Sequence, residues 1–292
     1  MHVFFSGIGG SGISSLALIA KQAGYEVSGS DKQDSDTLTS LRKQGITNVT
    51  VGQETADIAA AHEKQPIDWF VYSSAVSKEN PNHPELVFAR EQGIKMSKRD
   101  EFINAFLEDT DQQMIAIAGT HGKTTTTAMM IWLCQQAELS VSYLLGGKIP
   151  FGPSGHYDPK ATYFIYEADE YDRNFLSFSP AISIISGIAY DHPDIYPTEQ
   201  EYLDAFKSFA ENSEDIFGHN KDLQKIGLGS DEPSPVNEDD IALIGQVNRQ
   251  NAQLVVEAVS WMIEKPASEL LSAMNQFPGA HRRFEQITEN VY

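Results

Sequence analysis

The stretch HVFFSGIGGSGISSLALIAKQAGYEVSGSD, residues 2–31, decides the fold of the first part of this chain. Residues 2–6 form a short apolar run that predicts a buried strand, and residues 12–23 carry an apolar stripe at helical spacing. The glycine-rich segment GIGGSG at 7–12 separates them, and a second strand-like run ends at Asp31. A strand, a glycine turn, a helix and a second strand predict a parallel α/β sheet, with a helix N-terminus that can hold a phosphate group.

The spacing of these glycines, with an acidic residue at the end of the next strand, matches the dinucleotide fingerprint of a Rossmann unit. In that fingerprint the glycines let the backbone approach a diphosphate, and the acidic side chain binds a ribose. The pattern therefore predicts phosphate binding at the N-terminus of the first helix. It does not identify the ligand, which can be NAD or another nucleotide.

Composition excludes several classes of protein. A length of 292 residues suggests two domains. The formal net charge of -20 argues against a general binder of nucleic acid or of anionic membranes, because the field of the protein would repel both. Cys134 is the only cysteine, so we expect a buried structural thiol and a reducing compartment. The N-terminus does not resemble a signal peptide and no run of about 18 apolar residues occurs, so the sequence predicts a cytoplasmic protein.

A second unit is expected to begin near residue 110. The apolar run at 113–119 predicts a strand that leads into a second glycine loop, and the run at 124–137 predicts the helix that leaves it. Further buried strands are expected at 163–170 and 181–192, and Thr198 with Glu201 forms a capping box before another helix. Residues 211–240 are polar and rich in turn residues, which predicts a loop or a short hairpin.

The second glycine loop, GTHGKTT at 119–125, has the composition of a phosphate loop. Glycines let backbone N–H groups approach phosphates, a lysine reaches the β and γ oxygens, and a hydroxyl group can ligate the metal. The spacing departs from the usual phosphate-loop pattern, because position 117 is Ile and the first glycine lies only three residues before Gly122. A threonine-rich helix start after a tight turn is the alternative interpretation.

Acidic and histidine residues follow the next two predicted strands. Glu167 and Asp169 are two residues apart, so on a strand their side chains share a face. Phosphoryl transfer needs a carboxylate at such a strand end to hold Mg²⁺ beside the phosphates. Asp191 and His192 follow another apolar strand, and His192 could ligate a second metal or hold a reacting oxygen. The alternatives are a solvated acidic turn and a structural histidine.

Taken together, the motifs resemble those of a known family, the Mur ligases. They occur in this order along the chain: GIGGSGISSLA, SGSD, YSSAVSKENP, GTHGKTTTT, EADEYD, DHPD, NRQNA and HRRFE. The resemblance implies that the first glycine loop holds the diphosphate of a UDP-sugar rather than NAD, and that the second loop holds ATP. It further implies an ATP-dependent amide ligase of peptidoglycan precursor synthesis, which activates the carboxylate of UDP-N-acetylmuramate as an acyl phosphate for attack by L-alanine.

The resemblance also implies roles for individual residues. Lys123 should bridge the β and γ phosphates, and Thr124 and Glu167 should ligate a first Mg²⁺. His192 should lie at a second Mg²⁺, and His121 near the transferred phosphate. The residues expected to contact ATP, with adenine at the two asparagines, are Gly119, Thr120, His121, Gly122, Lys123, Thr124, Thr125, Asn248 and Asn251. The residues expected to contact the UDP-sugar are Gly9, Gly10, Ser11, Gly12, Asp31 and Ser74.

The same resemblance predicts the domain organisation. A Rossmann-like UDP-sugar-binding domain is expected at 1–108, and a central ATP-binding α/β domain of the P-loop type at 109–285. Residues 286–292 are expected to be the start of a third, ligase-completing domain that this chain lacks, so we expect a truncated form with little activity alone.

Three departures from the family pattern leave alternatives open. Gly187 and Ala189 stand where the family usually has an amide and a carboxylate, and Val247 stands where it usually has a histidine. The segments EADEYD and DHPDIY are more similar to the ligase of murein recycling, which attaches a tripeptide to the same UDP-sugar. Besides the alanine ligase and the tripeptide ligase, a non-catalytic protein that binds a UDP-sugar or a nucleotide is a third interpretation of the sequence.

Overall fold

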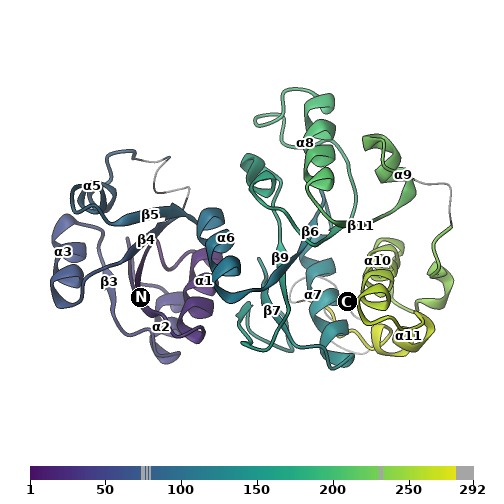
Figure 1. Cartoon of the computed structure of the whole chain (residues 1–292), viewed down its shortest axis with the longest axis horizontal. Coiled ribbons are helices and arrows are strands. Elements are labelled where there is room, and N and C mark those ends of the chain that lie inside the picture. Colours follow the sequence, from purple (N-terminus) through teal and green to yellow (C-terminus); the bar gives the residue numbers. More distant parts are fainter. Residues whose placement is uncertain (74–75, 77, 79, 230–232, 281–292) are drawn as a thin grey trace. The chain divides into compact units, whose positions relative to one another are not determined.

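Two compact units make up the computed structural model of this protein, which describes residues 1–73, 76, 78, 80–229 and 233–280. Unit 1 comprises Met1–Thr110 with Gly155–Pro159, and unit 2 comprises Asp111–Ser154 with Lys160–Tyr292. Each contains a sheet whose described strand pairs are parallel and which is packed against helices (Figure 1). The predicted α/β class, a Rossmann-like sheet followed by a P-loop-type sheet, is confirmed. Within the described ranges no helix combines the length and apolarity needed to cross a membrane.

Unit 1 alternates strands and helices along the chain. Its elements are β1 (His2–Ser6), α1 (Ser11–Gln22), β2 (Glu26–Asp31), α2 (Asp36–Lys43), β3 (Val49–Val51), α3 (Thr55–Lys64), β4 (Trp69–Tyr72), α5 (Pro84–Glu91), β5 (Lys95–Lys98) and α6 (Arg99–Thr110). The strand order β3-β2-β1-β4-β5 places β1 in the centre. From β1 the chain adds β2 and β3 on one side, and it then crosses over to add β4 and β5 on the other side. The strand order therefore reverses at the boundary between β1 and β4. Ligands of doubly wound sheets bind beyond the carboxyl ends of the strands at such a point.

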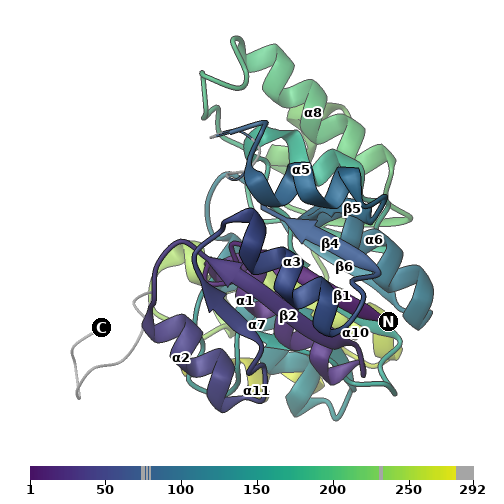
Figure 2. The same ribbon diagram turned by 90° about the vertical axis from the view of Figure 1, so that its left-hand side faces the viewer.

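The sheet of unit 1 buries side chains on both faces, as the alternation along a strand requires. On one face Phe4 stacks on Phe70, and both belong to a core that includes apolar residues of α3 and α5. On the other face Phe5 and Trp69 contact Phe102 of α6. Figure 2, turned by 90° from Figure 1, shows the strands of this unit with helices around them. A continuous apolar run such as 2–6 is therefore explained by a strand covered on both sides.

Unit 2 has a longer sheet, in the order β11-β10-β6-β9-β7-β8. Its elements are β6 (Gln113–Ala118), α7 (Lys123–Gln136), β7 (Val141–Leu144), β9 (Tyr163–Glu167), η1 (Tyr171–Ser177), β10 (Ile182–Ile185), α8 (Glu199–Glu211), β11 (Asp215–Gly218), α9 (Asn220–Leu223), η2 (Gln224–Ile226), η3 (Glu238–Asp240), α10 (Gln246–Ile263) and α11 (Ser268–Met274). The two-residue strand β8 (Gly155–His156) at the end of that order belongs to the segment Gly155–Pro159, which is part of unit 1. Residues of α7, α10 and α11 share one buried core with β6, β9 and β10 (Figure 1). Cys134 of α7 is fully buried in that core, as expected, and burial raises the pKa of its thiol to about 12.

One prediction about this unit is wrong. The segment 211–240 is neither a loop nor a hairpin, because Asp215–Gly218 forms β11, which pairs in parallel with β10. This edge strand has only four residues, all of them half-buried, so it lacks the apolar run by which strands were recognised. Thr198 is the N-cap of α8, since its hydroxyl accepts a hydrogen bond from the Glu201 N–H at 3.2 Å, which is one of the two hydrogen bonds of the predicted capping box.

A buried carboxyl group lies at the carboxyl ends of the strands in unit 1. Glu85 of α5 is fully buried, and its Oε2 accepts a hydrogen bond of 2.5 Å from the Ser6 hydroxyl at the end of β1. The Gln53 amide donates to both Ser6 Oγ and Glu85 Oε2. Glu85 Oε1 has no hydrogen-bond partner among the described residues. Burial raises the pKa of Glu85 to about 7, since removal from water disfavours the charged form.

This raised pKa predicts a pH-dependent stability. The folded chain retains the Glu85 proton above the ordinary value of 4.5, so the free energy of unfolding should fall as the pH rises from about 4.5 to about 7. The loss should reach roughly 3 kcal/mol. Urea denaturation at several pH values should show that Glu85→Gln, which keeps the shape and cannot ionise, removes this part of the pH dependence. Parallel pH profiles for the two proteins would contradict the prediction.

Candidate active site

The glycine loop of unit 1 connects β1 to α1 without a capping side chain. The N–H groups of Gly7 and Ile8 both donate to the Ser30 carbonyl at 2.9 Å, which ties the loop to the end of β2. Gly10 is the N-cap of α1, and no side chain accepts a hydrogen bond from the first turn. Uncapped N–H groups at a helix N-terminus form a site for an anion.

The structure brings several of the predicted UDP-sugar residues together at this loop. Asp31 Oδ2 accepts a hydrogen bond of 2.7 Å from the Gly9 N–H. A Cβ atom at Gly9 would lie only 2.7 Å from that oxygen, so the contact requires glycine. Gly10, Ser11 and Gly12 form the N-cap and first turn of α1. Ser74, the sixth predicted residue, lies outside the described residues.

The glycine loop of unit 2 connects β6 to α7 in the same manner. Gly119 and Gly122 have φ values of +141° and +85°, a region that side chains rarely adopt, and Gly122 is the N-cap of α7 with no capping side chain. The Thr120 N–H donates to the Gly187 carbonyl at 3.0 Å. The Ser186 hydroxyl donates to the His121 carbonyl at 2.5 Å. The loop is thus fixed to the segment that follows β10, and the first turn of α7 keeps its N–H groups open.

Thr124 and Glu167 converge at the start of α7. The Thr124 hydroxyl donates to Glu167 Oε1 at 2.8 Å, and the Gly146 N–H donates to Glu167 Oε2 at 2.9 Å. A hydroxyl and a carboxylate oxygen are hard ligands that suit Mg²⁺. Across the described part of the chain, no group of three or more His, Cys, Asp or Glu residues is arranged to hold a metal. A magnesium ion held by one carboxylate, one hydroxyl and substrate phosphates fits this arrangement, whereas a cage made only of protein ligands does not.

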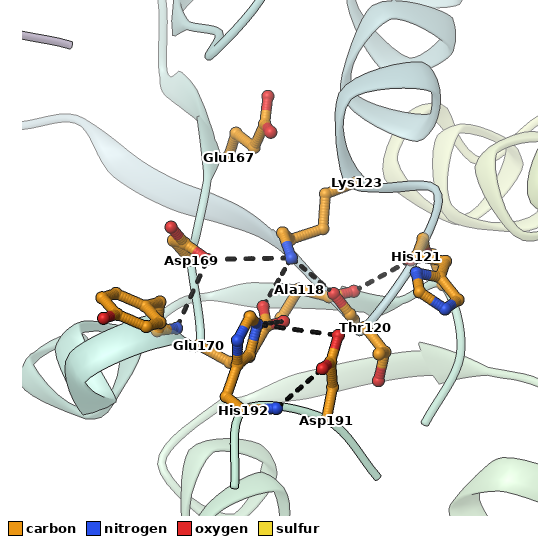
Figure 3. Close-up of polar contacts among 12 residues, drawn as sticks. Ala118, Thr120, His121, Lys123, Glu167, Asp169, Glu170, Asp191 and His192 are labelled. Carbon is orange, nitrogen blue, oxygen red and sulfur yellow. Dashed lines mark hydrogen bonds and ion pairs between the residues drawn. The ribbon is translucent and has the colours of Figure 1, made fainter. Parts of the chain in front are cut away.

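Lys123 and His192 meet at a residue that the sequence did not single out, Glu170. The Lys123 ammonium donates to Glu170 Oε2 at 2.5 Å and to the Gly119 carbonyl at 2.8 Å, and it lies 3.7 Å from Asp169 Oδ1. His192 Nε2 lies 3.4 Å from Glu170 Oε1. Figure 3 shows this group, with the Glu167 carboxylate directed away from His192. The three predicted metal ligands therefore do not all meet, because Thr124 contacts Glu167 whereas His192 lies beside Glu170, which was not predicted.

Glu170 is the most buried charge of the site. Its side chain has 0% exposure, and burial raises its pKa although the adjacent Lys123 ammonium lowers it. The Tyr196 hydroxyl donates to the Glu170 carbonyl at 2.6 Å and fixes the backbone. His192 has a φ of +54°, which is uncommon for a residue other than glycine and indicates local strain. A buried carboxylate between a lysine and a histidine holds two loops of unit 2 in one geometry.

Thr120 of the second glycine loop and Tyr202 of α8 form another polar contact in unit 2. Their hydroxyl groups lie 2.7 Å apart, and Thr120 Oγ1 also exchanges hydrogen bonds with the backbone N–H and carbonyl of Ala189. Tyr202 belongs to α8 and is fully buried. Nothing in the sequence of that helix indicates its hydroxyl contact. Because Thr120 contacts the backbone of Ala189, this contact does not depend on the carboxylate that the family usually has there.

The remaining predicted ATP residues lie at different distances from the loop. Asn251 is almost fully buried, and its Nδ2 would be 2.8 Å from a Cβ atom at Gly122. Neither polar atom of its amide has a hydrogen-bond partner in the described residues. Asn248, one turn earlier on α10, donates to the Ile244 carbonyl at 2.9 Å. Thr125 is buried in the first turn of α7, and His121 is exposed. Their contacts with adenine and phosphate stay predictions.

The Lys123–Glu170 pair generates a test of stability. Lys123→Met leaves the buried Glu170 carboxylate without its cation, and it should lower the free energy of unfolding by about 3 kcal/mol. Adding Glu170→Gln should recover most of that loss, because no buried charge then remains unpaired. Urea denaturation of the unmodified chain, the two single variants and the double variant gives the four unfolding free energies of a double-mutant cycle. Lys207→Met is the control, because Lys207 forms an exposed pair with Glu211 and should contribute less than about 1 kcal/mol. Strictly additive effects of the two changes would contradict the coupling.

Comparison with known proteins identifies the family. Residues 2–110 match the Mur ligase family, catalytic domain, and residues 117–226 match the Mur ligase middle domain. A UDP-N-acetylmuramate–L-alanine ligase of Clostridium tetani is 33% identical over 97% of this chain and 68% of its own length. Another of the same name from Roseiflexus castenholzii is 39% identical over 72% of this chain, but the match spans only 42% of that relative.

Solved structures agree with these matches. The crystal structure of UDP-N-acetylmuramate-alanine ligase from Thermotoga maritima superposes with a TM-score of 0.81 and 26% identity, over 99% of this chain and 71% of that chain. The structure of UDP-N-acetylmuramate:L-alanyl-gamma-D-glutamyl-meso-diaminopimelate ligase from Neisseria meningitides gives a TM-score of 0.76 and 25% identity, over 94% of this chain and 98% of that chain. Both glycine loops and the Glu167 strand end lie within the matched domains, and the chain belongs to the Mur ligase family.

Proposed function

We propose that this chain binds UDP-N-acetylmuramate through residues 1–108 and ATP with Mg²⁺ through residues 109–285. These are the corresponding parts of an ATP-dependent ligase that joins L-alanine to the muramate carboxylate in the cytoplasm. The observation that carries the proposal is the contact between Thr124 and Glu167 beside Lys123, at the uncapped N-terminus of α7. The Thr124 hydroxyl lies 2.8 Å from Glu167 Oε1. The names of the aligned relatives support the choice of substrates.

The proposed reaction forms an amide in two steps. A carboxylate oxygen of the muramate attacks the γ-phosphorus of ATP, the bond to the bridging oxygen breaks, and ADP leaves. The amine of L-alanine then attacks the acyl phosphate carbon, phosphate leaves with the bonding electron pair, and the amine loses a proton. Phosphate is a far better leaving group than the oxygen of a free carboxylate, which makes the second step possible.

The residues of unit 2 would contribute mainly charge and position. Lys123 and the open N–H groups of α7 would neutralise the β and γ phosphates, as a phosphate loop does. Thr124 and Glu167 would hold Mg²⁺, which stabilises the charge that develops on the transferred phosphoryl group. His192, held by Glu170, would lie near the acyl phosphate, where a second Mg²⁺ is proposed. His121 is proposed to lie near the transferred phosphate.

A second candidate is the same chemistry with a tripeptide as the amine. It is favoured by the segments EADEYD and DHPDIY and by the similarity to the Neisseria structure, whose name specifies a tripeptide. Competition between L-alanine and the tripeptide for ATP- and UDP-N-acetylmuramate-dependent phosphate release by the full-length enzyme distinguishes the two. Binding of both nucleotides without such release would favour the non-catalytic interpretation.

Thermal unfolding with added ligands tests the proposed sites. ATP with Mg²⁺ and UDP-N-acetylmuramate should each raise the melting temperature of this chain, because a ligand that binds only the folded state stabilises it by about 2.7 kcal/mol at a hundred times its Kd. Thr124→Val and Glu167→Gln should remove most of the shift caused by ATP with Mg²⁺ and leave the UDP-sugar shift unchanged.

Glu199→Gln is a matched control, since it removes one exposed carboxylate from α8 of the same unit. It should leave both shifts unchanged. A shift with NADH and none with UDP-N-acetylmuramate would reject the proposal in favour of a dehydrogenase.

A further inference from the structure

A guanidinium group lies against the glycine loop of unit 1, and neither set of predicted residues includes it. Arg99 follows β5 directly and is the first residue of α6. Its Nη1 atom lies 2.8 Å from the position that a Cβ atom at Gly12 would occupy, and its Cδ lies 3.7 Å from it. Gly12 is the second residue of α1. Any side chain at that position would therefore displace the guanidinium from the first turn of the helix.

The topology of unit 1 explains how residues 87 positions apart meet. β1 and β5 are parallel members of one sheet, so both the glycine loop and Arg99 follow the carboxyl ends of their strands. The carboxyl ends of parallel strands meet at one edge of the sheet, where doubly wound proteins bind their ligands. Arg99 therefore lies at the edge on which the proposed UDP-sugar site is built.

The Arg99 guanidinium is without a polar partner in the described part of the chain. Among the residues described, no hydrogen bond or ion pair engages its guanidinium, which is half-buried and carries five N–H donors. Its position is also electrostatically unfavourable, since the N-terminus of a helix carries a partial positive charge and a cation there destabilises the fold. A cation beside the uncapped start of α1 becomes favourable when an anion binds between them.

The loop itself supplies no positive charge for an anionic ligand. The segment GIGGSG contains no charged side chain, and among the described residues the side chain that accepts a hydrogen bond from its backbone N–H groups is the Asp31 carboxylate. The whole chain has a formal net charge of -20. A diphosphate approaching this loop would meet repulsion from Asp31 and from the overall field, which a local guanidinium can offset.

We propose that Arg99 is a binding residue for the diphosphate of the UDP-sugar, in addition to the backbone of the glycine loop. The inference rests on the proposed function of unit 1. The planar guanidinium donates two parallel N–H groups to phosphate oxygens, a geometry that a lysine ammonium cannot reproduce. Arg99 thus supplies the positive charge of the site, and Gly12 supplies the space for it.

Isothermal titration of UDP-N-acetylmuramate into four proteins tests this proposal. They are the unmodified chain, Arg99→Gln, Arg99→Lys and the control Arg90→Gln, which removes an exposed guanidinium from α5 of the same unit. Arg99→Gln should weaken binding about ten- to hundredfold, the range expected for hydrogen bonds to a charged group. Arg99→Lys should recover only part of the affinity, and Arg90→Gln should bind like the unmodified chain. The affinity for ATP with Mg²⁺ should be the same in all four.

Melting temperatures without ligand distinguish a binding role from a structural one. Arg99→Gln should melt at or above the temperature of the unmodified chain, because it relieves the unfavourable placement of a cation at the start of α1. If Arg99→Gln fails to fold, the test rests on Arg99→Lys, which the proposal expects to bind the UDP-sugar several-fold more weakly than the unmodified chain does.

The outcomes separate this inference from the proposed function. If the unmodified chain binds UDP-N-acetylmuramate and a folded Arg99→Gln or Arg99→Lys binds it equally well, the role of Arg99 is wrong and the proposed function stands. If the unmodified chain does not bind UDP-N-acetylmuramate, the proposed function of unit 1 is wrong, and the inference that rests on it is rejected as well.

Discussion

The geometry of unit 2 depends on one carboxylate that has no contact with water. Glu170 lies between the Lys123 ammonium and the His192 ring, and its backbone is held by Tyr196. An ionised group buried in this way is stable only while its cation stays paired with it. Lys123 is therefore fixed close to the N-terminus of α7 before any ligand arrives. Catalysis by positioning requires such order in the free protein, because less conformational freedom is then lost when the reactants bind.

Both units contain the same local device, one that suits the binding of a phosphate group. In each, a glycine ends the segment after a central strand and serves as the N-cap of a helix that lacks a capping side chain. The two loops differ in the charges near them. The loop of unit 2 carries its own lysine, whereas the loop of unit 1 has a guanidinium brought from the far end of the sheet. This difference follows from topology, since each strand of a parallel sheet delivers its next residue to the same edge.

The sequence predicted those parts of the molecule whose signals are local. Apolar runs such as 2–6 and the capping box at Thr198 depend on neighbouring residues, and the structure has the corresponding strand and helix. The short edge strand β11 was missed because four half-buried residues carry no periodic signal. Glu170 and Arg99 were missed for another reason. Glu170 contacts His192, 22 positions away, and Arg99 lies against Gly12, 87 positions away. Nothing in the segment EADEYD shows that Glu170 is the buried carboxylate, and nothing in SKRDEF shows that Arg99 is the charge beside the glycine loop.

The fully buried Cys134 has a practical consequence for the study of domain motion. A thiol with no exposed surface and a pKa raised to about 12 forms almost no thiolate at neutral pH, so labelling reagents do not reach or react with it. Because it is the only cysteine among these 292 residues, this chain without substitutions already serves as an unreactive background. One cysteine introduced on the surface of each unit would carry a fluorophore pair, and energy transfer between the two dyes would report the distance between the units in solution.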